Sequence, residues 1–190
     1  MQTHNNLYQK LYSYNNLFLA YKKARKGKSR KDYVIDFEKD LQNNLLKLQN
    51  ELRSFVYYPK PLKTFIIRDP KLRKISKSDF EDRIVHHAII NILEPIFDKT
   101  FISDSYANRK NKGNSKALSR LNLFIRKVTT NFNRKSYYLK CDIKHYFETV
   151  NREILIKIIK KKIRDIDFLN LISKVINNVS IGGGRPETRK

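Results

Sequence analysis

The sequence predicts an α+β protein that is rich in helix and has a small antiparallel sheet. Apolar residues recur every three or four positions over several long segments, which is the spacing of one face of an α-helix. Between these segments, short β-branched and aromatic runs separated by Pro-Lys-Pro and Asp-Pro turns indicate short strands. The 190 residues are enough for one good core or two small ones.

The first two helices are expected over residues 7–24 and 32–52. Each has an apolar stripe at helical spacing, and Ser29 or Asp32 is a candidate cap for the second helix. The basic run 22–31 lies between them. This run fits a phosphate-contacting loop, a nuclear-targeting patch or a solvated helix end.

Short strands are expected at 55–58, 64–67 and 74–76. Arg68 and Arg73 flank the turn between the second and third runs, so an antiparallel unit would carry both at one tip. Guanidinium groups suit phosphate oxygens, although the same pattern also fits a solvated hairpin.

Four later helices are expected, over 80–97, 116–128, 152–162 and 167–176, with Pro95 near the end of the first. Between the first two, the loop 101–114 places Tyr106 beside several basic residues. That mixture is typical of stacking and backbone contacts on nucleic acid. Asp165 and Asp167 resemble a paired acid site, but a cap in an inter-helix turn is the favoured interpretation.

The charge balance points to a polyanionic partner. Forty-one Lys and Arg face eighteen Asp and Glu, giving a formal net charge of +23 that is spread over the whole length. Such an excess strains a compact fold by self-repulsion unless a polyanion offsets it, so nucleic acid is the first partner to consider. A generally basic soluble protein or a ribosome-associated one is the alternative.

Cysteine and apolar content predict the compartment. The single Cys141 excludes an internal disulfide and a multi-cysteine metal site, which fits a reducing environment. The N-terminus has no signal-peptide pattern, and no apolar run approaches the roughly eighteen residues of a membrane helix. We therefore expect a soluble cytoplasmic protein with no membrane contact.

The stretch 137–151 carries the candidate chemistry. An apolar and aromatic run leads to Asp142 and then breaks into a polar turn, followed by Tyr146-Phe147 and an amphipathic segment that begins at Asn151. This pattern predicts a buried strand that delivers one carboxylate to its carboxyl end, where open sheets place their chemistry. By itself, such an aspartate is more often a turn former or a helix cap.

Several motifs in order resemble the reverse transcriptases of bacterial retroelements. The motifs are 15–24 (NNLFLAYKKA), 65–76 (FIIRDPKLRKIS), 82–88 (DRIVHHA), 93–97 (LEPIF), 104–109 (DSYANR) and 141–147 (CDIKHYF). They are most similar to the enzymes of diversity-generating retroelements and more distantly to group II intron enzymes. The likeness covers about the first 180 residues.

The resemblance implies the fingers and the first part of the palm of a right-hand polymerase. The implied divisions are a helical region at 1–54, fingers at 55–135, a partial palm at 136–181 and a flexible end at 182–190. Asp142 matches the first catalytic aspartate, which would bind both Mg²⁺ ions, and the backbone carbonyl of Ile143 would help to hold one. Carboxylates suit this role because Mg²⁺ prefers hard oxygen ligands.

The same resemblance assigns the substrate and nucleic-acid contacts. Phe147 matches the aromatic residue that packs under the sugar and excludes a ribose 2′-OH, so the implied substrates are deoxynucleoside triphosphates. Arg68 and Arg73 match the fingers residues that close on the triphosphate. Arg83, Arg109 and Lys112 would line the track of the RNA template and its DNA or RNA primer.

The sequence departs from the family's pattern in ways that bear on activity. It has no Tyr-x-Asp-Asp hairpin, no glycine-rich segment of the family's type before such a hairpin, and no thumb. A single carboxylate does not clamp two divalent cations, which need several anionic ligands.

The leading expectation is the N-terminal part of an RNA-directed DNA polymerase, a magnesium-dependent nucleotidyltransferase that is inactive as this fragment. The alternative is a non-catalytic, basic RNA-binding module derived from a reverse transcriptase. A third interpretation is a homing or adaptor factor whose accessory protein is a separate polymerase half.

Overall fold

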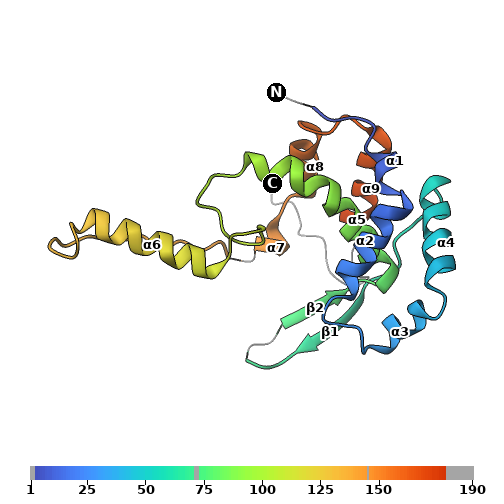
Figure 1. Ribbon diagram of the computed structural model, residues 1–190, viewed down its shortest axis with the longest axis horizontal. Helices are drawn as coiled ribbons and strands as arrows, with labels where there is room; N and C mark the ends of the chain where they lie inside the picture. The colour runs from blue at the N-terminus through green and yellow to red at the C-terminus, as the bar shows by residue number, and fades with distance from the viewer. Residues whose placement is uncertain (1–2, 71–72, 145, 179–190) are drawn as a thin grey trace, which may run out of the picture. The chain divides into compact units, whose positions relative to one another are not determined.

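The computed structural model describes residues 3–70, 73–144 and 146–178. These residues form a helix-rich structure with one two-stranded antiparallel sheet, which confirms the α+β class (Figure 1). The chain divides into two compact units, Met1–Glu94 with Thr149–Lys190, and Pro95–Glu148. We call these the helical unit and the inserted unit. The functional divisions implied by the resemblance stay predictions, and the expected flexible end 182–190 lies outside the described residues.

Each of the first two predicted helices is divided in the structure. The four helices are α1 (Tyr8–Leu11), α2 (Tyr14–Arg25), α3 (Asp32–Glu38) and α4 (Leu41–Arg53). The first break arises because the Ser13 side chain accepts the backbone N–H of Asn16 and so caps α2. At the second break, the Asn44 side chain donates to the Phe37 carbonyl at 3.0 Å, which satisfies an acceptor at the end of α3.

The sheet is a hairpin of β1 (Lys63–Ile67) and β2 (Arg73–Lys77), with Lys63 paired to Lys77 and Ile67 paired to Arg73. Two of the three predicted strands are thereby confirmed.

The predicted strand at 55–58 is wrong. Tyr57 is buried there, and its hydroxyl donates to Asp82 at 2.8 Å. Lys174 donates to the carbonyls of Phe55 and Tyr57, so a lysine rather than a neighbouring strand satisfies this backbone.

Helix α5 (Phe80–Phe97) contributes the centre of the core through Ile84, Val85 and Ala88. Asn16 ties α2 to this helix by donating to the Ala88 carbonyl at 3.2 Å and accepting from Asn91 at 2.8 Å. The helix ends just after Pro95, and the short 3₁₀ turn η1 (Asp98–Thr100) follows.

The last two helices complete the helical unit. They are α8 (Arg152–Lys160) and α9 (Ile166–Ile176), and α1 packs against both α2 and α9. Asp165 caps α9 by accepting the Phe168 N–H at 3.0 Å, which confirms the predicted cap. Its second oxygen accepts the N–H groups of Leu7 and Tyr8 at 2.6 and 2.9 Å. One buried carboxylate thus ties the N-terminal segment to α9.

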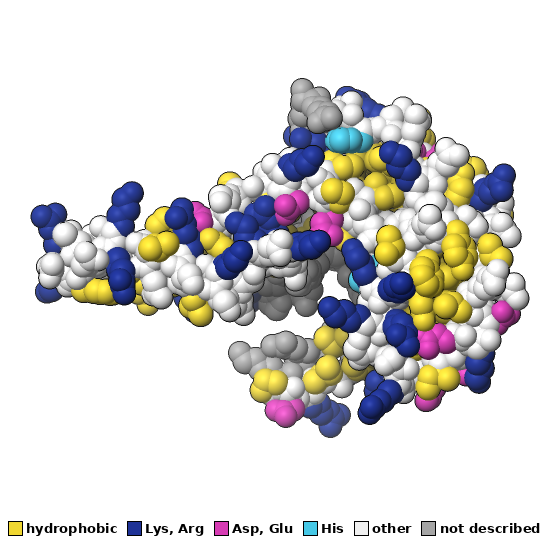
Figure 2. Space-filling view, viewed as in Figure 1, with side chains coloured by type: hydrophobic (Ala, Val, Ile, Leu, Met, Phe, Trp, Pro, Cys, Tyr) yellow, Lys and Arg dark blue, Asp and Glu magenta, His cyan; other side chains and the backbone are white. Residues whose placement is uncertain are grey.

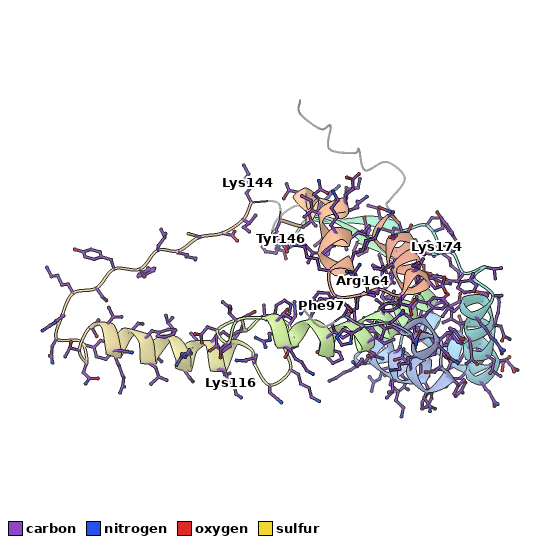
Figure 3. The ribbon with its side chains drawn as sticks, turned by 90° about the horizontal axis from the view of Figure 1, so that it is seen from above. Phe97, Lys116, Lys144, Tyr146, Arg164 and Lys174 are labelled. Atoms are coloured by element: carbon purple, nitrogen blue, oxygen red, sulfur yellow. The ribbon has the colours of Figure 1, made fainter. Side chains whose placement is uncertain are left out.

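The inserted unit contains α6 (Asn114–Val128) and, at its end, most of the short helix α7 (Tyr146–Thr149). Helix α6 has no buried residue, and Figure 3 shows its side chains projecting on several sides along its length. Across the described part of the chain, no helix is both long and apolar enough to cross a bilayer.

Candidate nucleic-acid interface

The hairpin brings two predicted triphosphate contacts to one end. Arg68 follows the last residue of β1, and Arg73 begins β2 opposite Ile67. The Arg68 side chain is exposed. The register therefore places both arginine backbones at the same end of the hairpin, while the Arg73 side chain lies outside the described atoms. Their contact with a triphosphate stays a prediction.

The stretch that leads to Asp142 differs from its prediction. It forms no strand, and the side chains of Tyr137, Tyr138 and Leu139 are 96%, 92% and 87% exposed. Figure 3 shows the chain running in extended form between α6 and Lys144 with its side chains projecting outward. A strand needs a hydrogen-bonding neighbour, and the described residues supply none here. The expected buried strand is therefore wrong, although Asp142 does follow an extended apolar run.

The residues around Asp142 do not assemble a two-metal site. Asp142 is exposed, and Ile143, whose carbonyl is the other expected ligand, has a 66% exposed side chain. The side chain of Phe147 lies outside the described atoms, so its contact with a sugar stays a prediction. Within the described ranges, no three His, Cys, Asp or Glu residues lie close enough to hold a metal ion. Two Mg²⁺ ions need several anionic oxygens, so this donor set does not fit them.

Arg109 organises the loop between η1 and α6. Its guanidinium forms an ion pair with Asp98 at 2.6 Å and donates to the backbone carbonyls of Asp98, Ile102 and Ser105. Its side chain is only 12% exposed. Hydrogen bonding to Arg109 lowers the pKa of Asp98. These contacts give Arg109 a structural role in the loop, and its predicted contact with nucleic acid is untested.

Lys112 also contributes to this loop. Its ammonium donates to the Ser103 carbonyl at 2.6 Å and lies 5.1 Å from the centre of the Tyr106 ring. Asp104 accepts from Tyr106 and from Arg120 of α6. The aromatic and basic side chains predicted from the sequence are therefore brought together, and they are held by contacts within the inserted unit.

Arg83 lies in a second aromatic and basic cluster, in the helical unit. Its guanidinium carbon is 4.9 Å from the ring centre of Tyr33 and 5.3 Å from that of Phe80. Lys77, the last residue of β2, lies 4.3 Å from the same Tyr33 ring. Tyr33 and Lys77 were not among the nucleic-acid contacts predicted from the sequence. The available signal was an aromatic residue two positions after the end of the basic run 22–31.

Two adjacent histidines lie on α5 near this cluster. Burial lowers the pKa of His86, and its Nε2 atom is buried with no hydrogen-bond partner among the described residues. Burial also lowers the pKa of His87, and the charges of Lys23, Lys28 and Arg83 lower it further. The positive charges that act on His87 thus come from α2, from the basic run and from α5 itself.

Lys and Arg outnumber Asp and Glu in the chain by 41 to 18. Figure 2 shows Lys and Arg side chains spread over the visible face, with few Asp and Glu side chains between them. This distribution agrees with the expectation of a basic surface rather than a basic tail.

Comparison with known proteins identifies the relatives of the chain. It is 29% identical over 177 residues to the COX1/OXI3 intron 1 protein of Saccharomyces cerevisiae, covering 90% of this chain and 20% of that protein. It is 26% identical over 168 residues to the group II intron-encoded protein LtrA of Lactococcus lactis, covering 86% of this chain and 26% of LtrA. The chain is related to group II intron-encoded proteins.

A third relative is protein YkfC of Escherichia coli, 30% identical over 131 residues that make up 68% of this chain and 34% of YkfC. The chain thus spans about a fifth to a third of the length of these curated relatives. No family model matches it. Kinship with intron-encoded proteins supports the retroelement resemblance, and a specific likeness to the diversity-generating type stays a prediction.

Proposed function

We propose that this chain is related to the fingers and first palm segment of a reverse transcriptase and that it binds RNA. The observation that carries the proposal is its kinship, over most of its length, with proteins encoded in introns, together with a net charge of +23. Lys and Arg neutralise phosphates, so a surface of this charge favours a polyanion.

In the complete form of such an enzyme, RNA would be copied into DNA from a primer with deoxynucleoside triphosphates. Asp142 would supply the first carboxylate and Phe147 the ring that discriminates against ribose. Magnesium would neutralise charge on the transferred phosphoryl group when bound. The described residues do not hold the other anionic ligands.

A specific observation favours the second candidate, a non-catalytic RNA-binding module. Asp142 is exposed on an extended segment, and the described residues form no group of three His, Cys, Asp or Glu that could hold a metal ion, whereas the basic surface needs no further group in order to bind RNA. An accessory protein that supplies the missing ligands belongs to the same proposal as a further partner.

Two assays on the purified chain test these functions. Binding to a labelled single-stranded RNA should weaken steeply with salt, because each neutralised phosphate contributes roughly 0.7 to the slope of log affinity against log salt. Primer extension on an RNA template should be absent, or should be lost in Asp142→Ala but kept in Asp167→Ala, which changes another exposed aspartate.

The outcomes separate the candidates. Extension that depends on Asp142 supports a polymerase, and salt-dependent binding without extension supports the module. Affinity for RNA that does not change with salt contradicts both.

A further inference from the structure

Two cations lie close to one tyrosine ring in the helical unit, and the charge of a third acts on it. Lys77 lies 4.3 Å and Arg83 4.9 Å from the Tyr33 ring centre. Burial alone would raise the pKa of Tyr33, but a hydrogen bond from Arg83 and the charges of Arg83, Lys77 and Lys28 together lower it. The three cations come from the basic run, the end of β2 and the first turns of α5, so the fold brings together residues far apart in the sequence.

These cations are available for an anion. The ion pairs of the described residues use other Lys and Arg side chains, and Lys28, Lys77 and Arg83 take part in none of them. Arg83 donates weakly to the Asp79 carbonyl, 3.4 Å from Nε. The charges of Lys28 and Arg83, together with that of Lys23, also lower the pKa of His87. Uncompensated cations of this kind bind phosphate oxygens well.

Tyr33 also lines a pocket of about 340 Å³. The rings of Tyr33, Phe37 and Phe80 form its aromatic wall, and its polar residues are Asp36, Asn44, Asp79 and Glu81. This volume lies at the lower end of the range for small-molecule pockets. Aromatic rings favour stacking with a base, and carboxylate oxygens accept hydrogen bonds from amino groups.

The polar residues of the pocket keep part of their accepting capacity. Lys60 contacts two of the three carboxylates, at 2.6 Å from Glu81 and 3.4 Å from Asp79, and the third, Asp36, pairs with Lys39 at 2.8 Å. One lysine therefore serves two acids, and each carboxylate has several lone pairs. An exocyclic amino group can donate hydrogen bonds to these carboxylate oxygens. The O4 carbonyl of uracil cannot, because it is itself an acceptor.

We propose that Tyr33 and the surfaces beside it form a nucleotide subsite for single-stranded RNA. A backbone phosphate lies on Lys77 and Arg83, and a base with an exocyclic amino group enters the pocket next to Tyr33. This subsite rests on the proposed RNA binding and locates it on the helical unit.

The phosphate half of the subsite is tested with the double variant Lys77→Gln/Arg83→Gln. The matched control is Lys157→Gln/Lys160→Gln, which removes the same charge from exposed positions on α8. Binding of labelled oligo(rC) to the full chain is measured by fluorescence anisotropy at salt concentrations from roughly 50 to 300 mM. The first variant should reduce the salt slope by roughly 1.4, two contacts of about 0.7 each, and the control should leave it unchanged.

The base half is tested by comparing oligo(rC) with oligo(rU) of equal length. The chain should bind oligo(rC) more tightly by about tenfold, and Glu81→Gln/Asp79→Asn should remove most of that preference. Thermal unfolding of every variant checks that the helical unit still folds.

The possible outcomes test different parts of the proposal. If the chain binds neither oligonucleotide, the proposed RNA binding is wrong. If it binds both, but Lys77→Gln/Arg83→Gln and the control Lys157→Gln/Lys160→Gln weaken binding equally, the phosphate contacts are spread over the surface and the phosphate subsite is wrong. Equal affinity for the two oligonucleotides overturns the base pocket while RNA binding stands.

Discussion

The helical unit and the inserted unit contain amphipathic helices of similar pattern, but they differ in what those helices bury. In the helical unit, Leu17, Leu52 and Phe168 are fully buried. In the described part of the inserted unit, Thr129 is the one buried residue, and Leu118, Leu121 and Val128 of α6 are 51–63% exposed. The repeat of three and four predicts a helix in both cases, and it does not predict what covers the apolar face.

The two units differ in where the stability of their helices comes from. Packing of an apolar face provides most of the stability of a helix in a protein, because an isolated helix of about fifteen residues is marginal in water. The helical unit supplies its own packing through its core. The apolar stripe of α6 has no such cover among the described residues, and an exposed stripe of this kind is typical of a surface that another element covers.

The largest expected effect tests this contrast directly. Phe168→Ala in α9 removes a fully buried ring and should lower the free energy of unfolding by about 3–5 kcal/mol. Phe124→Ala in α6 removes a ring that is 42% exposed, and it should change the free energy by less than about 1 kcal/mol. Urea unfolding followed by circular dichroism measures both. Equal losses would mean that the face of α6 is covered.

A second prediction concerns the carboxylate that joins the N-terminal segment to α9. Asp165→Asn should lower the free energy of unfolding by roughly 2–3 kcal/mol at neutral pH, because Asp165 accepts three backbone N–H groups as a buried anion. The exposed Asp167→Asn, in the same turn, is the control.

The pH dependence of this effect has a definite sign. Burial would raise the pKa of Asp165, but hydrogen bonds from the backbone of Phe168, Tyr8 and Leu7 lower it overall. Its stabilisation is therefore present above the unfolded pKa of about 3.9 and is lost as the pH falls through the folded value. The difference between wild type and Asp165→Asn should shrink in acid, and a difference that grows there would contradict this account.

The smallest expected effect concerns Asp82, the other buried aspartate. Burial raises its pKa, although hydrogen bonds from Tyr57 and from the Lys60 N–H oppose the shift. The folded state holds the proton more tightly, so the contribution of Asp82 is most favourable below the unfolded pKa of about 3.9 and declines as the pH rises through the folded value.

Asp82→Asn should therefore lower the free energy of unfolding by less than about 1.5 kcal/mol at pH 7. Its penalty should shrink as the pH rises from 4 to 7, in the opposite direction to that of Asp165→Asn. Chemical unfolding at several pH values measures both variants. A penalty that grows with pH would show that Asp82 is stabilised as an anion.

Much of the local structure could be predicted because it depends on neighbours in the sequence. The hairpin at 63–77 follows from two short apolar runs around an Asp-Pro turn, and α5 follows from its long apolar repeat. The cap at Asp165 follows from an acid between two helical repeats. The strand before Asp142 was predicted wrongly because an apolar run specifies a strand only when another strand pairs with it.

The candidate site could be predicted only in part. Arg68 and Arg73 come to one end of the hairpin because their register depends on a short turn. Arg109 has a basic neighbourhood in the sequence, but only its contacts with Asp98 and three carbonyls show that the loop uses its guanidinium internally.

By itself, the sequence determined the helix-rich class, the hairpin, the cationic surface and the resemblance to retroelement enzymes, because period, composition and ordered motifs are local properties of a chain. Only the folded structure shows that Asp165 ties the N-terminal segment to α9 and that Lys77 and Arg83 reach Tyr33. In each case the partners are far apart in the sequence, and such side chains meet only when the packing of the core fixes the elements that carry them.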